Sequence, residues 1–219
     1  MGMNTNTNTP QQEPIISLLS RTTAFVKTHK TGVLVTLVAV IAAVSLGWAY
    51  KAHCDKITEE SWAAYYTAQT AFATGSDEQG ITQLDELAAH YPNTPAAEYA
   101  QLFKGDFLYA KEDFAKAADT YKNLLKARTQ AVRNVAVLSL AAAYQAKGDY
   151  KDSADVASDF IKNNPTSFAL PQAYLTLALS QEFAGNKVQA IEAYTYLLEN
   201  YTKTYFGTFA KDKLAVLKK

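Results

Sequence analysis

The residue types that most often perform catalysis or bind metals are thinly spread along this chain. Its three histidines, His29, His53 and His90, and its single cysteine, Cys54, show none of the spacings typical of a metal site. The sequence also contains no glycine-rich phosphate loop and no nucleophile paired with a base. We therefore predict a protein that is not an enzyme and that holds no cofactor or metal. A buried polar cluster in the fold would be needed to reopen the enzyme alternative.

Adjacent carboxylates add little to this picture. Neighbouring residues of a helix do not face each other, so such pairs are expected on solvated surfaces rather than as an acid and a base. The pairs are Glu59-Glu60, Asp77-Glu78 and Asp85-Glu86. Cys54 has a single adjacent histidine, which is too little to indicate a reactive thiol.

The most distinctive element is a run of 20 uncharged residues, 31–50, bounded by Lys30 and Lys51. As a helix this run is about 30 Å long, which matches the hydrocarbon core of a bilayer. Nine of its residues are Leu, Ile or Val, and Trp48 and Tyr50 stand at one end, where aromatic rings favour the membrane interface. The run predicts a transmembrane helix. The alternatives are a buried core helix, which seldom lacks charge over such a length, and a cleaved signal peptide.

The flanks of this run indicate its orientation. Arg21, Lys27 and Lys30 precede it, whereas Lys51 and Lys56 follow it. The excess of basic residues on the N-terminal side favours a cytoplasmic N-terminus, with the rest of the chain across the membrane.

The segments around the apolar run have distinct compositions. Residues 1–14 are polar and low in complexity, so we expect disorder there, followed by an amphipathic lead-in helix over 15–30. Residues 51–60 form a tether to a domain large enough for a substantial core. The 21 basic and 21 acidic residues of the chain balance, so neither a nucleic-acid partner nor an acidic tail is indicated.

The part of the chain after the tether repeats itself four times. Gly75, Glu112, Gly148 and Gly185 are spaced 37, 36 and 37 residues apart. Each is preceded by an apolar helical segment and followed by an amphipathic one, as in NVAVLSLAAAYQAK and GDYKDSADVASDFI. A fixed period in this range, built from two helices, is typical of a solenoid. We predict four repeats over 61–204 and a capping helix over 205–219, with a polar face formed by Lys211, Asp212, Lys213 and Lys218.

Small residues set the register of the repeat. Counting each unit from Ser61, Glu98, Asn134 and Pro171, the eighth position holds Ala68, Gly105, Ala141 and Ala178, and the twentieth holds Gly80, Ala117, Ser153 and Ala190. Two helices approach closely only where both offer small side chains, so these positions predict the contact between the helices of one unit. The twenty-fourth position holds Leu84, Tyr121, Ala157 and Tyr194, which are expected to fill the core between units.

These units resemble the tetratricopeptide repeat family, most clearly in AKEDFAKAADTYKNLLK and KGDYKDSADVASDFIKNNP. They depart from it in a period two or three residues longer than 34, in bulky residues at the twenty-seventh position, and in Thr129 and Thr202 where proline is usual. The order of a polar N-terminus, one span, a tether and irregular repeats resembles the YfgM-type ancillary subunits of the SecYEG translocon. That resemblance implies a bacterial inner-membrane protein with periplasmic repeats.

In the tetratricopeptide repeat family the first helix of each unit lines a concave groove, through its second, fifth, ninth and twelfth positions. Carried over, the apolar candidates for a partner-binding groove are Trp62, Tyr65, Phe72, Tyr99, Leu102, Tyr109, Leu138, Leu175 and Leu179. The polar positions include Asp106, Gln145 and Glu182, and none of the sixteen is Lys or Arg. The resemblance therefore implies a groove for hydrophobic protein segments, although the same residues could instead be core.

The function that these observations favour is protein–protein interaction. We expect a membrane-tethered scaffold or chaperone-like accessory for envelope or translocon proteins. The alternative is a structural factor for envelope assembly or cell division that acts by self-association as a homo-oligomer.

Overall fold

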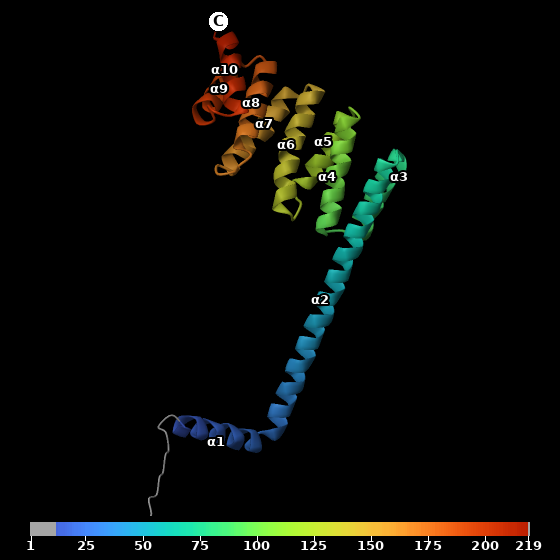
Figure 1. The fold of residues 1–219 in the computed structure, drawn as a ribbon, viewed down its shortest axis with the longest axis vertical. Helices are drawn as coiled ribbons and strands as arrows, with labels where there is room; N and C mark the ends of the chain where they lie inside the picture. The colour runs from blue at the N-terminus through green and yellow to red at the C-terminus, as the bar shows by residue number, and fades with distance from the viewer. Residues whose placement is uncertain (1–11, 219) are drawn as a thin grey trace, which may run out of the picture. The chain divides into compact units, whose positions relative to one another are not determined.

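The computed structural model describes residues 12–218, with side chains from Ser20 onward, and every regular element in this range is an α-helix. The chain divides into two compact units, Met1–Lys56 and Ile57–Lys219. Figure 1 shows the helices in chain order, from α1 to α10. The all-α class predicted from the sequence is confirmed.

The N-terminal unit contains α1 (Gln12–Thr28) and the first part of α2 (Lys30–Ala73). The predicted disorder of residues 1–14 falls outside the described residues except at its last three, which belong to α1. Pro14 lies in the first turn, where a helix makes no use of the backbone N–H that proline lacks. The lead-in helix can therefore start three residues before the predicted boundary.

Residues 31–50 lie within α2, and all of their side chains except that of Val33 are exposed. Within the described part of the chain, α2 is the one helix long and apolar enough to cross a membrane by length and composition. None of its apolar stretch is buried in the protein, which excludes the alternative of a core helix. A membrane anchor and an N-terminal signal sequence share these properties.

The helix α2 continues through residues 51–60, the predicted tether, and ends only at Ala73. No glycine or proline interrupts residues 51–73, so nothing in the local sequence stops the helix. The Lys51 ammonium also lies 2.6 Å from the Asp55 carboxylate one turn further on. The segment expected to be only a connection is thus continuous with the first helix of the first repeat.

The second unit, Ile57–Lys219, is a series of helical hairpins. Its helices after α2 are α3 (Asp77–His90), α4 (Pro95–Ala110), α5 (Phe114–Leu124), α6 (Gln130–Lys147), α7 (Tyr150–Asn163), α8 (Leu170–Phe183), α9 (Lys187–Asn200) and α10 (Tyr205–Leu217). From α3 onward each helix packs against the next, and α4, α6, α8 and α10 also contact one another in series (Figure 1). This is the solenoid that the 36–37-residue period predicts.

The small residues of the predicted register are buried. At the eighth position Ala68, Ala141 and Ala178 have no exposed surface, and at the twentieth neither do Ala117, Ser153 and Ala190. Within the third hairpin the Ser153 hydroxyl donates a 2.7 Å hydrogen bond to the Ala141 carbonyl, so the two helices touch at this point. At Gly105 a Cβ atom would lie 2.5 Å from the ring of Tyr121, which shows why a larger residue does not fit. The register is confirmed.

The turns inside the hairpins explain the glycine spacing. Gly75, Gly148 and Gly185 have φ angles of +78°, +91° and +79°, in the left-handed region that glycine adopts without steric cost. Glu112 occupies the same position in the second hairpin with φ of +63°. The repeat period is therefore the spacing of one required backbone conformation, and Glu112 adopts it at a cost of about 1–2 kcal/mol.

A carboxylate explains why Thr129 replaces the usual proline. Glu98 on α4 accepts hydrogen bonds from the backbone N–H of Arg128 and, at 2.9 Å, from that of Thr129, just before α6 begins. Proline has no N–H to donate. Partial burial raises the pKa of Glu98, but the hydrogen bonds from Thr129 and Arg128 outweigh it and hold the pKa below its ordinary value of 4.5.

We expect Glu98→Gln to destabilise the protein by about 1 kcal/mol at pH 7, because a neutral amide accepts the two backbone hydrogen bonds more weakly than a carboxylate does. Because the folded state lowers the pKa of Glu98, its ionised form contributes stability above pH 4.5, and this contribution disappears as the pH falls through the folded-state pKa. The difference between wild type and variant should therefore shrink in acid. Urea unfolding followed by circular dichroism at several pH values measures it. Glu199→Gln, an exposed change on α9, is the matched control, and equal unfolding of the two variants at pH 7 would contradict the assignment.

The helix α10 covers the end of the solenoid. Ala210 and Leu214 are buried in one cluster with the apolar residues of α8 and α9, as expected of a capping helix. Gly207 allows the close approach, since a Cβ there would lie 2.3 Å from the Tyr201 carbonyl oxygen. The predicted polar face is wrong at Lys213, whose ammonium is half-buried and lies 2.9 Å from the Glu182 carboxylate on α8.

Candidate protein-interaction surface

A stripe of aromatic rings joins α2 to α4, the first helices of the first two hairpins. The ring of Trp62 lies 5.7 Å from that of Tyr99 and 5.6 Å from that of Tyr65, measured between centroids. Tyr65 in turn lies 6.4 Å from Phe103. Since the rings meet at tilted or edge-to-face angles, the contacts are of the kind that aromatic pairs prefer.

The stripe continues along α4. Phe72 lies 5.1 Å from Phe103 and 4.7 Å from Phe107. We call this continuous set the aromatic seam: Trp62, Tyr65, Phe72, Tyr99, Phe103 and Phe107. All six side chains are half-buried, so each presents part of its surface to solvent.

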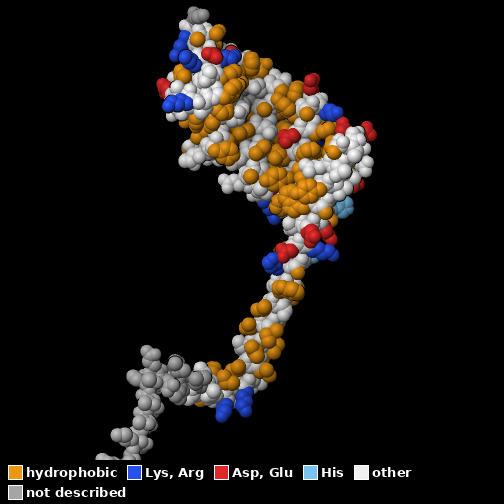
Figure 2. Space-filling view, in the orientation of Figure 1, with side chains coloured by type: hydrophobic (Ala, Val, Ile, Leu, Met, Phe, Trp, Pro, Cys, Tyr) orange, Lys and Arg blue, Asp and Glu red, His pale blue; other side chains and the backbone are white. Residues whose placement is uncertain are grey.

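The outer edge of the seam is widened by Tyr66. Its ring stacks on Trp62 at 6.2 Å, and 61% of the residue is exposed. The Tyr65 hydroxyl accepts a 2.9 Å hydrogen bond from Gln69, and partial burial, followed by the nearby Tyr66, raises the pKa of Tyr65. Figure 2 shows hydrophobic side chains gathered on the visible face of the repeats, densely near α4. The seam is thus a largely apolar surface, bordered by the Lys111 ammonium, which lies 5.2 Å from the centroid of the Phe107 ring.

The structure separates the predicted groove residues into four groups. Trp62, Tyr65, Phe72 and Tyr99 belong to the seam. Tyr109 lies apart from it and packs on Phe114, at 5.2 Å, beside the turn of the second hairpin.

Leu102 and Leu175 are core residues, each less than a tenth exposed, so their assignment to a groove is wrong. They occupy the fifth position of the second and fourth units, whereas Tyr65 and Leu138, at the same position of the first and third units, are half-buried. Leu138 and Leu179 are half-buried, and Leu179 packs against the cluster under the capping helix.

Two acidic groove positions are held by tyrosines of the second helices. The Tyr121 hydroxyl donates to Asp106 at 2.7 Å, and the Tyr194 hydroxyl donates to Glu182 at 2.6 Å. Desolvation raises the pKa of Asp106 despite the bond from Tyr121. Lys213 of α10 also binds Glu182. These acids serve the internal packing of the hairpins and the cap.

A buried polar chain connects the third and fourth hairpins. The Gln145 amide donates to the Ser180 hydroxyl at 3.0 Å, Ser180 donates to Ser153 at 2.8 Å, and Ser153 donates to the Ala141 carbonyl. Every link ends on an acceptor that is not a base, so neither serine is activated as a nucleophile. This buried cluster fixes how the hairpins pack and does not supply a catalytic arrangement.

Sequence reasoning missed Phe103, Phe107 and Tyr66. Phe103 and Phe107 are one turn apart on the side of α4 that faces α2, and Tyr66 follows Tyr65 directly. The density of aromatic residues in SWAAYYTAQTAF and EYAQLFKGDFLY could have indicated these three residues. They were missed because none of them occupies one of the four groove positions of the family.

Stacked hairpins with small residues at each internal contact define a helical repeat protein. The chain belongs to the tetratricopeptide repeat-like domain family, whose model matches residues 23–158. A second model, tetratricopeptide repeat, matches residues 172–204. No curated protein sequence matches the chain.

Solved structures share this fold. The MamA fragment "41-end" from Desulfovibrio magneticus RS-1 is 19% identical, with a TM-score of 0.56 over 74% of this chain and 91% of that one. The nearly identical TPR-like repeats of a putative kinesin light chain from Podosopora anserina are 14% identical, with a TM-score of 0.57 over 73% of this chain and 86% of that one. These likenesses concern the fold alone.

Membership of this family indicates the general kind of function. Tetratricopeptide repeats are scaffolds that bind other proteins and are typically non-catalytic. Aromatic anchors contribute most of the affinity in many protein interfaces, which makes the aromatic seam a candidate surface for this role.

Proposed function

We propose that this protein is a membrane-tethered scaffold or chaperone-like accessory of the bacterial cell envelope. Residues 31–50 anchor it in the inner membrane, its N-terminus is cytoplasmic, and its repeats lie in the periplasm. The proposal is supported by the exposed apolar stretch of α2, which would be unfavourable in water over such a length.

The single observation that carries the interaction role is the aromatic seam. Six rings in contact, with Tyr66 exposed beside them, form a surface without charged side chains among its members. Such a surface suits a hydrophobic segment of another protein, extended or helical. We place that partner among envelope proteins, in the neighbourhood of the Sec translocon.

The topology is tested by fusions after Lys219. Alkaline phosphatase folds only in the periplasm, so its fusion should be active in cells. A fluorescent protein that matures only in the cytoplasm should remain dark at the same position. The control is the same pair of fusions at the N-terminus, where the opposite result is expected because Arg21, Lys27 and Lys30 favour the cytoplasm. A dark, inactive phosphatase fusion together with a bright fluorescent one at the C-terminus would contradict the topology.

A further inference from the structure

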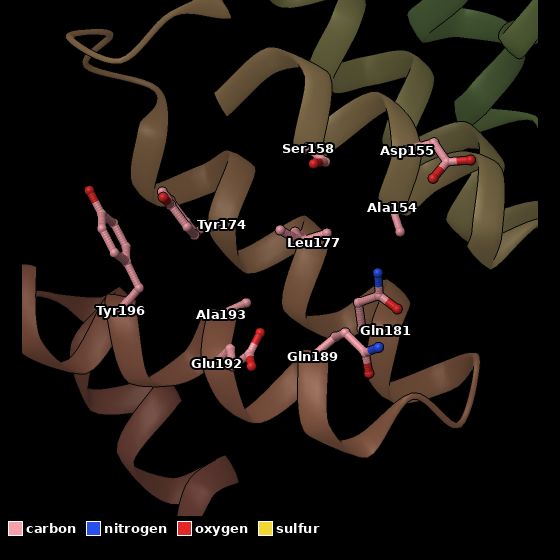
Figure 3. Close-up of a pocket in the computed structure, with 10 residues that line it drawn as sticks. All are labelled: Ala154, Asp155, Ser158, Tyr174, Leu177, Gln181, Gln189, Glu192, Ala193 and Tyr196. Carbon is pink, nitrogen blue, oxygen red and sulfur yellow. The ribbon is translucent and has the colours of Figure 1, made fainter. Parts of the chain in front are cut away.

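Two hollows in the surface of the protein differ in their lining. One, of about 410 Å³, lies in the repeats, where a pair of tyrosines stacked at 3.7 Å shares the wall with polar side chains (Figure 3). The other, of about 580 Å³, lies in the N-terminal unit at the bend between α1 and α2. The described part of its wall is largely apolar and includes Phe25 of α1 and Val33, Leu37 and Val40 of α2. This second hollow has the chemistry of a lipid-facing surface.

The bend at this hollow lies directly beside the apolar run. The helix α1 ends at Thr28 and α2 begins at Lys30, so the chain bends at His29. The Thr28 hydroxyl donates a 2.9 Å hydrogen bond to the Ala24 carbonyl one turn earlier, a contact that often bends helices. The apolar run starts at Thr31, and a link of three residues spans at most about 10 Å. The end of α1 is therefore held at the boundary of any bilayer that the run crosses.

One side of α1 is apolar. At about 100° per residue, six positions fall within about a third of the helix circumference. They are Ile15, Leu18, Leu19, Thr22, Phe25 and Val26. Of these, Phe25 is 61% exposed and Val26 is 45% exposed, so nothing in the protein covers this end of the apolar side.

The opposite half of α1 carries basic residues. Arg21 and Lys27 fall on this half, and both are exposed, as is Lys30 at the start of α2. Glu13 is the one acidic residue of the sequence before the apolar run. Figure 2 shows basic side chains on one side of this segment and hydrophobic side chains on another. Helices with this division of residues lie in the headgroup region of membranes, and the cytoplasmic leaflet is the anionic one.

We propose that α1 lies along the cytoplasmic surface of the membrane and binds its anionic phospholipids. Phe25 and Val26 would insert among the acyl chains, one of which would fill the hollow at the bend. Arg21 and Lys27 would pair with the phosphate groups. The inference rests on the proposed membrane anchor and cytoplasmic N-terminus. It adds to the anchor a second contact, which depends on the charge of the lipid.

The test compares two sides of α1 in the full-length protein, reconstituted into vesicles that contain about one third phosphatidylglycerol in phosphatidylcholine. In a Cys54→Ser background, a fluorescent label is attached to Val26→Cys or to Ala24→Cys, which lies on the opposite side of the helix. Acrylamide should quench the label at position 26 at least threefold less than the label at position 24, because the bilayer covers position 26. In vesicles of phosphatidylcholine alone, this difference should fall at least twofold.

Variants test the role of charge. Arg21→Gln combined with Lys27→Gln should reduce the protection of position 26 in anionic vesicles to its value in neutral ones. Lys211→Gln combined with Lys218→Gln removes the same charge from exposed positions near the C-terminus and should leave the protection unchanged. Equal quenching at positions 24 and 26, or protection that responds neither to the lipid nor to Arg21 and Lys27, would overturn the proposal.

Flotation of the vesicles in alkaline carbonate separates this proposal from the anchor on which it rests. A protein that does not float with the vesicles would contradict the membrane anchor, and the role of α1 with it. A protein that floats but is quenched equally at both positions would contradict the role of α1 alone.

Discussion

Replacing Ala141 by phenylalanine should destabilise the repeats by about 1–3 kcal/mol or more, the usual cost of forcing a large side chain into a packed core. Ala141 has no exposed surface, and its carbonyl accepts the hydrogen bond from Ser153 across the third hairpin. Moving the two helices apart would also break the chain from Ser153 through Ser180 to Gln145. The change should therefore weaken both the hairpin and its contact with the next one.

Lys151→Phe is the matched control, since Lys151 is exposed on α7. A surface change away from packed or bonded positions usually alters stability by well under 1 kcal/mol. Thermal melts of both variants, followed by circular dichroism, measure the difference. Equal melting temperatures would show that Ala141 does not lie at the contact between the helices.

The contact at Ala141 could be predicted from the sequence because it belongs to the repeat pattern. The period of 36–37 residues is carried by the turn at Gly75, Glu112, Gly148 and Gly185, which needs a left-handed residue. The positions of the buried small residues follow from the same register, because two helices can touch only where both carry small side chains. Both requirements are local or repeat regularly, so one sequence suffices to find them.

The remaining contacts depend on how successive hairpins are placed, which no single unit encodes. Glu98 reaches Thr129, 31 residues away, and Lys213 reaches Glu182 across the same separation. Leu102 fits the groove pattern of the family but lies in the core, whereas Phe103 and Phe107 of the same helix lie against Phe72. The sequence therefore predicted where the candidate site lies and that it is aromatic, but it predicted only some of the residues that form it.

The second prediction concerns this site. We expect Tyr99→Ala and Tyr66→Ala each to weaken partner binding at least fivefold, which corresponds to about 1 kcal/mol. Tyr99 packs on Trp62 from α4 and Tyr66 stacks on Trp62 within α2, so each truncation removes one side of the same anchor. Partners should be captured from native membranes by photo-crosslinking from position 69, identified, and then measured with the purified full-length protein in micelles. Because apolar burial is not screened by ions, the affinity at the seam should change little between low and high salt.

Tyr205→Ala provides the control for these variants. Tyr205 is an exposed tyrosine of α10, 68% accessible, which packs on Phe206 and Phe209 and has no contact with the seam. The variant Tyr205→Ala also removes a tyrosine side chain from the surface of the repeats. Any general effect of losing an aromatic residue would therefore appear in this variant too. Circular dichroism of all three variants establishes that they are folded. If Tyr99→Ala and Tyr66→Ala are folded and bind like Tyr205→Ala, or if the captured partner dissociates in high salt, then the seam is not the surface that recognises this partner.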